Sequence, residues 1–155
     1  MCRSLRRTVH LPVPSGLGGN VGLAPWPCTP CCLNLGYVAV NVLVVDDDPG
    51  FRQVAYALLR ARGMHVVAEC ADGASAVAAV RAHEPDGVLL DVHLPDQDGM
   101  SVARVLREGP HPPRVVLTST DRSPWSGEEL AAAGVEAFVT KDLLYDTDLA
   151  RLLSP

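Results

Sequence analysis

Carboxylate, hydroxyl and amine side chains follow four short apolar runs in this sequence. Asp46 and Asp47 follow one run, and Asp91 follows another. Thr118 follows a third run, and Lys141, the single lysine of the chain, follows a fourth. Carboxylates held close together repel each other, but Mg²⁺ binds their oxygens and removes this repulsion. An ammonium group and a hydroxyl can both bind phosphoryl oxygens, so this set of residues suits phosphoryl transfer.

The residue types also limit the kind of reaction. Phosphoryl transfer passes through a loose transition state, so catalysis depends mainly on positioning and charge neutralisation. No serine or cysteine nucleophile motif, and no general base paired with such a nucleophile, accompanies these residues. We therefore expect a carboxylate nucleophile, which would form an aspartyl phosphate.

Regular apolar patterns define the elements that must position these residues. The run 42–45 contains three β-branched residues and is typical of a strand buried on both faces. Apolar residues then recur at helical spacing, and Gly63 is expected to end this helix. The apolar residues of this helix are Phe51, Val54, Ala55, Leu58 and Leu59. Further strands are predicted at 65–68, 87–90, 114–117 and 137–140, and further helices at 74–82, 99–107 and 146–153, with another between the capping box Ser126–Glu129 and Gly134.

The alternation of strands and helices predicts a parallel sheet covered by helices on both faces. In such a sheet, ligands bind beyond the carboxyl ends of the strands. The acidic, hydroxyl and lysine residues named above all come directly after predicted strands. We therefore expect three carboxylates, two hydroxyls (Thr118 and Ser119) and the lysine to meet at one edge of the sheet.

Several other polar residues fit simple structural roles. Asp48 suits a helix N-cap and Pro49 the first helical position after it. Asp98 suits a second N-cap, and Asp72-Gly73 suits a turn. Trp125 lies in a predicted loop, where local packing is favoured over contact with a partner.

The same stretches resemble the four signatures of bacterial response-regulator receiver domains, most closely those of the NarL/FixJ type. The matching segments are 44–49, 89–99, 117–119 and 138–141, in order and at the spacing that the fold requires. The resemblance covers residues 41–155. It implies a flavodoxin-like, doubly wound (βα)5 fold with five parallel strands in the order 2-1-3-4-5.

The resemblance implies a role for each residue of the acidic group. Asp91 accepts a phosphoryl group from the phosphohistidine of a histidine kinase. Mg²⁺ is bound by Asp47, Asp91 and the backbone carbonyl of His93, with Asp46 acting directly or through a water. Lys141 pairs with a phosphoryl oxygen.

Two further residues are implied to act as switches. Thr118 moves toward the phosphoryl group, and Phe138 follows it as the aromatic switch residue. Phe138 lacks the hydroxyl of the frequent tyrosine, so its switching can only be a change of packing. Asp142 stands where many receivers have proline. The geometry of this loop is therefore not implied by the resemblance. The side chain of His93 lies near the path of attacking water, and we expect it to affect the rate of dephosphorylation.

The resemblance also suggests how the protein acts. The chain ends at Pro155, just after the last predicted helix, so we expect a stand-alone, cytoplasmic receiver. A sensor histidine kinase or phosphotransfer protein would phosphorylate it, and it would signal by binding a downstream target protein. Homodimerisation through the surface of the fourth helix, fifth strand and fifth helix is a further option. Apart from its own phosphotransfer and aspartyl-phosphate hydrolysis, we expect no enzymatic activity.

Composition excludes two classes of partner. The net charge of −5 argues against direct binding of nucleic acid, which requires clustered Lys and Arg. No run of 18 apolar residues occurs, so we expect no segment that spans a membrane.

Two other functions are alternatives to that of a receiver. A phosphatase of the haloacid dehalogenase type needs a second aspartate two residues after its nucleophile, where this chain has His93. The length also leaves no room for its cap domain. A degenerate, phosphorylation-independent receiver-like interaction module is the other alternative, and the intact acidic pair, acceptor and lysine argue against it.

Residues 1–40 have a different composition from the rest of the chain. They are rich in Pro and Gly, and all 18 acidic residues come after them. We expect either a non-native extension, caused by a start codon assigned too far upstream, or a disordered arm. A third option is a metal site, because Cys28 and Cys31 have the spacing of half a zinc site that only Cys2 and His10 could complete.

Overall fold

The computed structural model describes residues 39–155, so the predictions for the N-terminal extension and its cysteines lie outside the described residues. Five parallel strands form one sheet in the order β2-β1-β3-β4-β5. This order confirms the predicted flavodoxin-like, doubly wound topology.

Strands and helices alternate along the chain from the first strand to the last helix. Their bounds are β1 Asn41–Val45, α1 Pro49–Ala61, β2 His65–Cys70, α2 Gly73–His83, β3 Gly87–Asp91, α3 Gly99–Arg107, β4 Arg114–Ser119, α4 Gly127–Ala132, β5 Val135–Thr140, the 3₁₀ helix η1 Lys141–Leu143, and α5 Leu149–Leu153.

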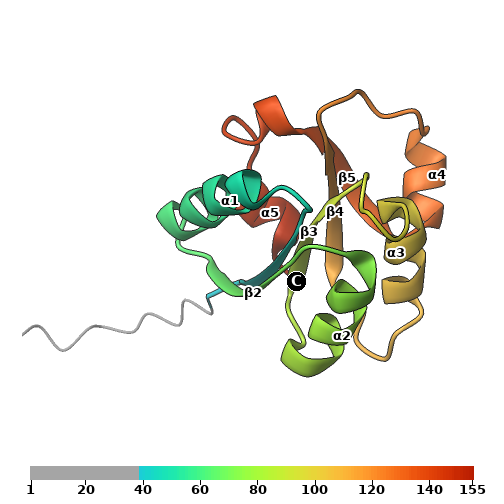
Figure 1. The fold of residues 1–155 in the computed structure, drawn as a ribbon, viewed down its shortest axis with the longest axis horizontal. Helices are drawn as coiled ribbons and strands as arrows, with labels where there is room; N and C mark the ends of the chain where they lie inside the picture. The colour runs from blue at the N-terminus through green and yellow to red at the C-terminus, as the bar shows by residue number, and fades with distance from the viewer. Residues whose placement is uncertain (1–38) are drawn as a thin grey trace, which may run out of the picture. The chain divides into compact units, whose positions relative to one another are not determined.

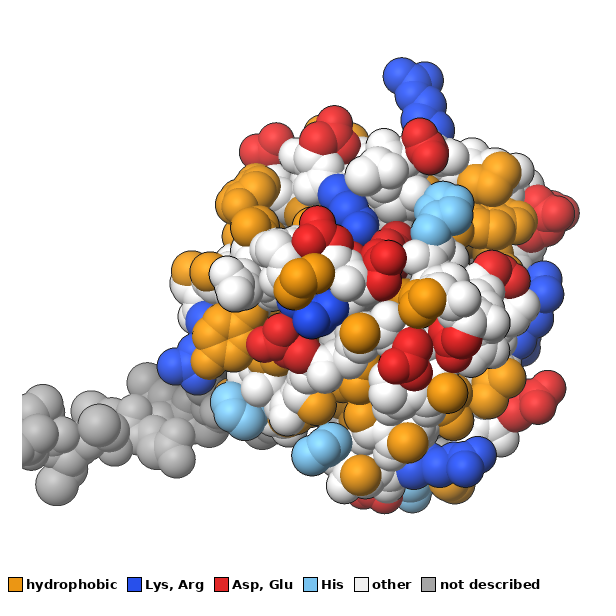
Figure 2. Space-filling view, viewed as in Figure 1, with side chains coloured by type: hydrophobic (Ala, Val, Ile, Leu, Met, Phe, Trp, Pro, Cys, Tyr) orange, Lys and Arg blue, Asp and Glu red, His pale blue; other side chains and the backbone are white. Residues whose placement is uncertain are grey.

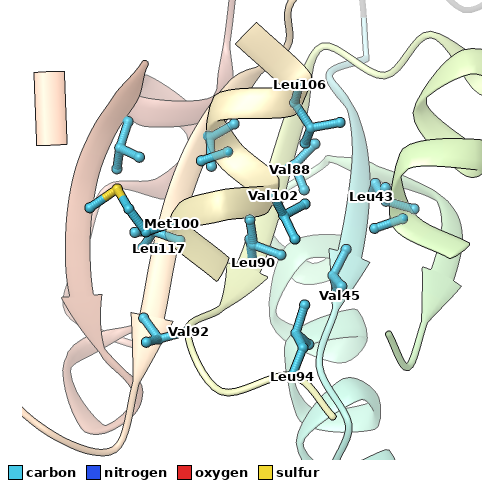
Figure 3. Close-up of a cluster of buried hydrophobic side chains, with 14 of the residues drawn as sticks. Leu43, Val45, Val88, Leu90, Val92, Leu94, Met100, Val102, Leu106 and Leu117 are labelled. Atoms are coloured by element: carbon cyan, nitrogen blue, oxygen red, sulfur yellow. The ribbon is translucent and has the colours of Figure 1, made fainter. Parts of the chain in front are cut away.

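Helices cover both faces of the sheet, with α1 and α5 on one face and α2, α3 and α4 on the other (Figure 1). Successive side chains of β1 point to opposite faces, as the pleat of a strand requires. Leu43 and Val45 belong to a buried cluster with Leu106 of α3, part of which Figure 3 shows. Val44 belongs to the opposite cluster, with Leu59 of α1. The uninterrupted apolar run of β1 is therefore explained by burial on both faces.

Aspartate side chains begin several helices by accepting hydrogen bonds from backbone N–H groups. The predicted caps at Asp48 and Asp98 are confirmed, as is the capping box of Ser126. Asp72, predicted in a turn, instead caps α2 by accepting a hydrogen bond from the backbone of Ser75. At the other end of α1, Gly63 adopts a φ of +78°, which agrees with its predicted place after the helix.

Two other predictions about helices were wrong. Val54 was expected on the apolar face of α1 but is 42% exposed. It lies about 100° around the helix from the buried Ala55, outside the narrow stripe that faces the sheet. The last helix was expected to begin at 146 but begins at Leu149, because Asp148 caps it.

In the described part of the chain, the helices are short, and acidic and basic side chains are interspersed on the face shown in Figure 2. Within residues 39–155, no helix is both long enough and apolar enough to cross a membrane. On the face shown in Figure 2, Lys and Arg side chains are separated from one another by acidic and neutral groups.

The start of α3 lies tightly against the end of β3, and Gly99 makes this contact possible. A Cβ atom at Gly99 would lie 2.3 Å from the backbone oxygen of Asp91 and 3.0 Å from Val92 Cα. These atoms belong to the backbone and cannot move aside as a flexible side chain could. The absence of a side chain at this position therefore fixes how closely α3 approaches the end of β3.

Replacing Gly99 with Ala should lower the free energy of unfolding by about 1–3 kcal/mol, because the added methyl group overpacks this contact. Urea denaturation would measure the change. Gly127→Ala is the matched control, since no atom lies within 4 Å of its Cβ position. If both variants had the same stability, the contact at Gly99 would not be tight in solution.

Candidate functional site

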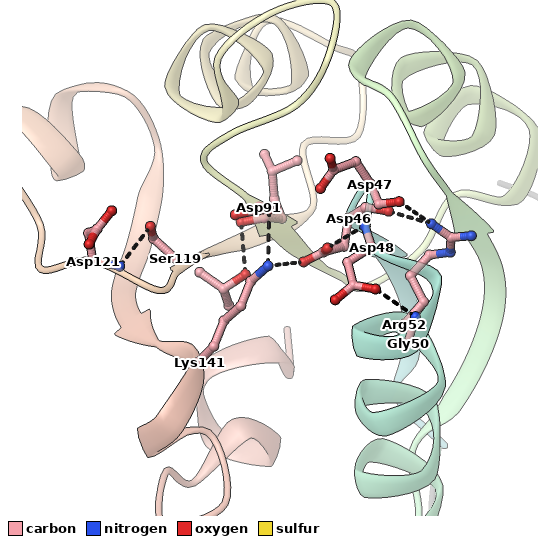
Figure 4. Close-up of polar contacts among 11 residues, drawn as sticks. Asp46, Asp47, Asp48, Gly50, Arg52, Asp91, Ser119, Asp121 and Lys141 are labelled. Carbon is pink, nitrogen blue, oxygen red and sulfur yellow. Dashed lines mark hydrogen bonds and ion pairs between the residues drawn. The ribbon is translucent and has the colours of Figure 1, made fainter.

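The two acidic residues after β1 have different surroundings. Asp46 is fully buried, and its Oδ1 accepts a hydrogen bond of 3.0 Å from the backbone of Asp48. Asp47 is exposed at the rim of the same edge. One carboxylate of the pair therefore points into the protein, while the other remains open to water (Figure 4).

Asp91 and Lys141 complete the charged group at this edge of the sheet. Asp91 ends β3 and is only 3% exposed. Lys141 follows β5, and its Nζ lies 2.6 Å from Asp46 Oδ2 and 3.0 Å from Asp91 Oδ2. The predicted meeting of these residues is thus observed, with the single ammonium between two buried carboxylates.

The three carboxylates form a group that could hold a metal ion. One oxygen from each of Asp46, Asp47 and Asp91 lies within 4.8 Å of the others. Asp91 Oδ1 is buried and has no hydrogen-bond partner among residues 39–155. Asp46 Oδ2 forms a close ion pair with Lys141, but the angles of this contact are not those of a hydrogen bond. Buried carboxylate oxygens without donors fit a hard cation, and this donor set suits Mg²⁺.

Burial and charge act in opposite directions on this group. Burial raises the pKa of Asp46, and the contact with Lys141 offsets part of this rise. Burial alone would lower the pKa of Lys141, but the carboxylates of Asp46 and Asp91 together outweigh it, so that the net shift is upward. The ammonium is therefore charged at neutral pH and compensates much of the negative charge around it.

The hydroxyl groups at the end of β4 do not both face the acidic group. Thr118 is buried and pairs with Asp91 across the two strands, and its Oγ1 donates to the Leu90 carbonyl over 3.4 Å. Ser119 Oγ instead accepts a hydrogen bond from the backbone of Asp121. Thr118 is thus next to the end of β3, whereas Ser119 shapes the following loop.

Phe138 lies on β5 beside the loop that follows β4. Its ring centroid is 6.4 Å from that of Trp125, with the ring planes tilted by 59°. Both rings are partly buried and pack against the cluster between the sheet and α3. The predicted local packing of Trp125 is therefore observed, and its partner is Phe138.

His93 lies two residues after Asp91, with its imidazole exposed to solvent. Its backbone forms an isolated antiparallel bridge with Asp98, which holds the loop before α3. The ligand role of its carbonyl stays a prediction.

Two residues that secure the site were missed by the sequence analysis. The guanidinium of Arg52 donates to the backbone oxygen of Asp46 over 2.6 Å, and to that of Asp47 over 3.3 Å. Asp96 accepts hydrogen bonds from the backbone of Gly73 and Ala74, which tie the loop after β3 to the start of α2 and lower the pKa of Asp96. The only hint for Arg52 is its place one turn into α1, close to the acidic pair.

Comparison with known proteins points to one family. The family profile described as "Response regulator receiver domain" matches residues 42–153. The "Probable transcriptional regulatory protein NarL" of Mycobacterium tuberculosis is 39% identical over 104 residues, which are 66% of this chain and 48% of that protein. The "Probable transcriptional regulatory protein TcrX" of the same organism is 40% identical over 114 residues, covering 73% of this chain and 48% of that protein. This chain therefore spans about half the length of these curated relatives.

Solved structures agree with this match. The signal receiver domain of the M. tuberculosis protein NarL is 39% identical and has a TM-score of 0.61, with 67% of this chain and 85% of that chain covered.

Lys141→Met should reduce the free energy of unfolding at pH 7 by about 3 kcal/mol, because two buried carboxylates lose their counter-charge. The loss should be smaller at pH 5. Without the ammonium, the raised pKa of Asp46 rises further. A carboxyl that binds its proton more tightly in the folded than in the unfolded state gains stability as the pH falls.

Urea denaturation at both pH values, in the presence of a chelator, would measure this difference. Arg60→Met is the matched control, since Arg60 is an exposed cation of α1. An equal loss at pH 5 and pH 7 for Lys141→Met would contradict the electrostatic explanation.

Proposed function

Because this chain belongs to the family of response regulator receiver domains, we propose that residues 41–155 accept a phosphoryl group onto Asp91 and signal by contact with other proteins. The donor is the phosphohistidine of a sensor histidine kinase or of a phosphotransfer protein. Receivers are signalling modules, and we assign this one no enzymatic activity beyond its own phosphotransfer and aspartyl-phosphate hydrolysis.

The state of the Asp91 carboxylate is the observation that carries this proposal. It is buried at the end of β3, and one of its oxygens has no hydrogen-bond partner among the described residues. Its other oxygen accepts a hydrogen bond from Lys141. An Asp91 oxygen forms the new bond to phosphorus while the phosphorus–nitrogen bond of the donor breaks. The bonding pair returns to the imidazole nitrogen, which takes up a proton.

We assign a Mg²⁺ ion to the acidic group, with Asp46, Asp47, Asp91 and the backbone carbonyl of His93 as its ligands. When bound, Mg²⁺ neutralises charge on the carboxylates and on the phosphoryl oxygens. The exposure of Asp47 leaves one side of the group open to water and to the donor. Lys141 pairs with a phosphoryl oxygen and compensates the charge that the phosphoryl group adds.

The added charge is proposed to act first on Thr118 and then on Phe138. Thr118 is next to Asp91 across the strands, and its long hydrogen bond to Leu90 can be exchanged for one to a phosphoryl oxygen. Phe138 and Trp125 would then repack, which changes the surface of α4, β5 and α5. This surface would bind the downstream target, and a second copy of the chain is another partner for it.

Incubation with acetyl phosphate and Mg²⁺ should add the mass of one phosphoryl group to the protein and not to an Asp91→Asn variant. Intact-protein mass spectrometry would detect the adduct, and a chelator should prevent its formation. Turnover of acetyl phosphate without an adduct would indicate a phosphatase. An unmodified wild-type protein would indicate a receiver-like module that works without phosphorylation.

His93→Asn should slow the loss of the phosphoryl group, because the exposed imidazole is close to the path of the attacking water. The half-life of the adduct after removal of acetyl phosphate measures this effect. His111→Asn is a control, since His111 lies on the loop before β4 and is also exposed. An unchanged half-life in His93→Asn would dispose of the role of the imidazole.

A further inference from the structure

The ammonium of Lys141 lies against an aromatic ring as well as between carboxylates. Its Nζ is 4.3 Å from the centroid of the Phe51 ring. A lysine ammonium within about 6 Å of a ring centroid is attracted by the electron-rich face of the ring. Phe51 belongs to the first turn of α1, whereas Lys141 follows β5, so the contact joins two distant parts of the chain.

The contacts of the ammonium differ in kind. The bond to Asp91 has hydrogen-bond geometry, whereas the 2.6 Å contact with Asp46 is a close ion pair without hydrogen-bond angles. Such an ion pair attracts the ammonium but does not orient it. The long side chain of lysine has many conformations. The third contact, with the Phe51 ring, therefore helps to fix the position of the ammonium.

We propose that Phe51 is a positioning residue for Lys141, whose ring face holds the ammonium beside the acceptor Asp91; this rests on the proposed function. The ring offers attraction without an oxygen that would compete for the ammonium. One N–H bond of the ammonium therefore remains directed at Asp91, and it can pass to a phosphoryl oxygen. When Phe51 cannot attract the cation, phosphoryl transfer to Asp91 becomes slower.

A simpler role for Phe51 must be separated from this one. The ring is partly buried and packs against the cluster between the sheet and α1, alongside Leu58. Any apolar side chain of similar volume would satisfy that packing. The test must therefore change the charge distribution of the ring while its size stays nearly constant.

Replacement of Phe51 by mono-, di- and trifluorophenylalanine provides such a series, because each fluorine weakens the negative face of the ring with little change in volume. The initial rate of phosphorylation by acetyl phosphate and Mg²⁺ should fall stepwise, by about three- to tenfold over the series. Phe51→Tyr, which keeps the ring face, should retain the wild-type rate, whereas Phe51→Leu should be as slow as the trifluoro variant.

The control is Tyr56→Leu, which removes the only other aromatic ring of α1. Arg60 lies over that ring at 5.9 Å, on the exposed side of the helix. This variant should be phosphorylated at the wild-type rate. If the wild type is phosphorylated but the fluorinated series shows one constant rate, the inference fails while the proposed function stands. If the wild type takes up no phosphoryl group, both fail.

A second measurement needs no phosphorylation. Lys141 is the single lysine of the chain, so its side-chain methylene signals in an NMR spectrum of protein with isotope-labelled lysine need no assignment. The ring current of Phe51 should shift the protons next to Nζ upfield in the wild type and in Phe51→Tyr, and this shift should disappear in Phe51→Leu. Identical lysine signals in all three proteins would overturn the inference.

Discussion

Repulsion between carboxylates at one edge of the sheet governs which side chains can surround them. Asp46 and Asp91 are both buried, and Asp47 brings a third carboxylate within 4.8 Å of them. Burial makes each negative charge costly, and proximity adds to that cost. Among residues 39–155, Lys141 is the one side chain that compensates both buried charges directly. One ammonium does not balance three carboxylates, so a further cation would stabilise the group. The proposed Mg²⁺-assisted phosphoryl acceptor needs this property.

The strand order explains which residue type lies at which strand end. β1 and β3 are neighbours, so the short side chains of Asp46 and Asp91 can meet directly. β4 lies between β3 and β5, and Thr118 at its end is next to Asp91. Lys141 comes from beyond β5, two strands away from β3, and only a long side chain spans that distance. The chemistry of the site thus depends on topology, because the same residues on another strand order would not meet.

Much of this could be predicted from the sequence, since strand ends and helix caps depend on local patterns. The apolar runs located all five strands, and the residues after them located the acidic group and Lys141. Arg52 and Phe51 could not be recognised in the same way. Their roles depend on how α1 is oriented over the end of β1, so that Arg52 reaches two backbone oxygens and Phe51 reaches Lys141. The exposure of Val54 depends on that orientation as well.

The strand ends around the site are not held equally firmly. This difference determines which of them would move when a charge is added. The β1 and β3 ends are held by the Arg52 hydrogen bonds, by the close packing at Gly99 and by the Asp96 bonds to α2. The β4 side is held less firmly: the Thr118 hydrogen bond is 3.4 Å long, and none of the residues of α4 is buried. If Asp91 is phosphorylated as we propose, the added charge would displace the side of α4 and β5 rather than the acidic loop. The ends of β1 and β3 are suited to bind and orient the phosphoryl group, whereas the side of β4, α4 and β5 is suited to move.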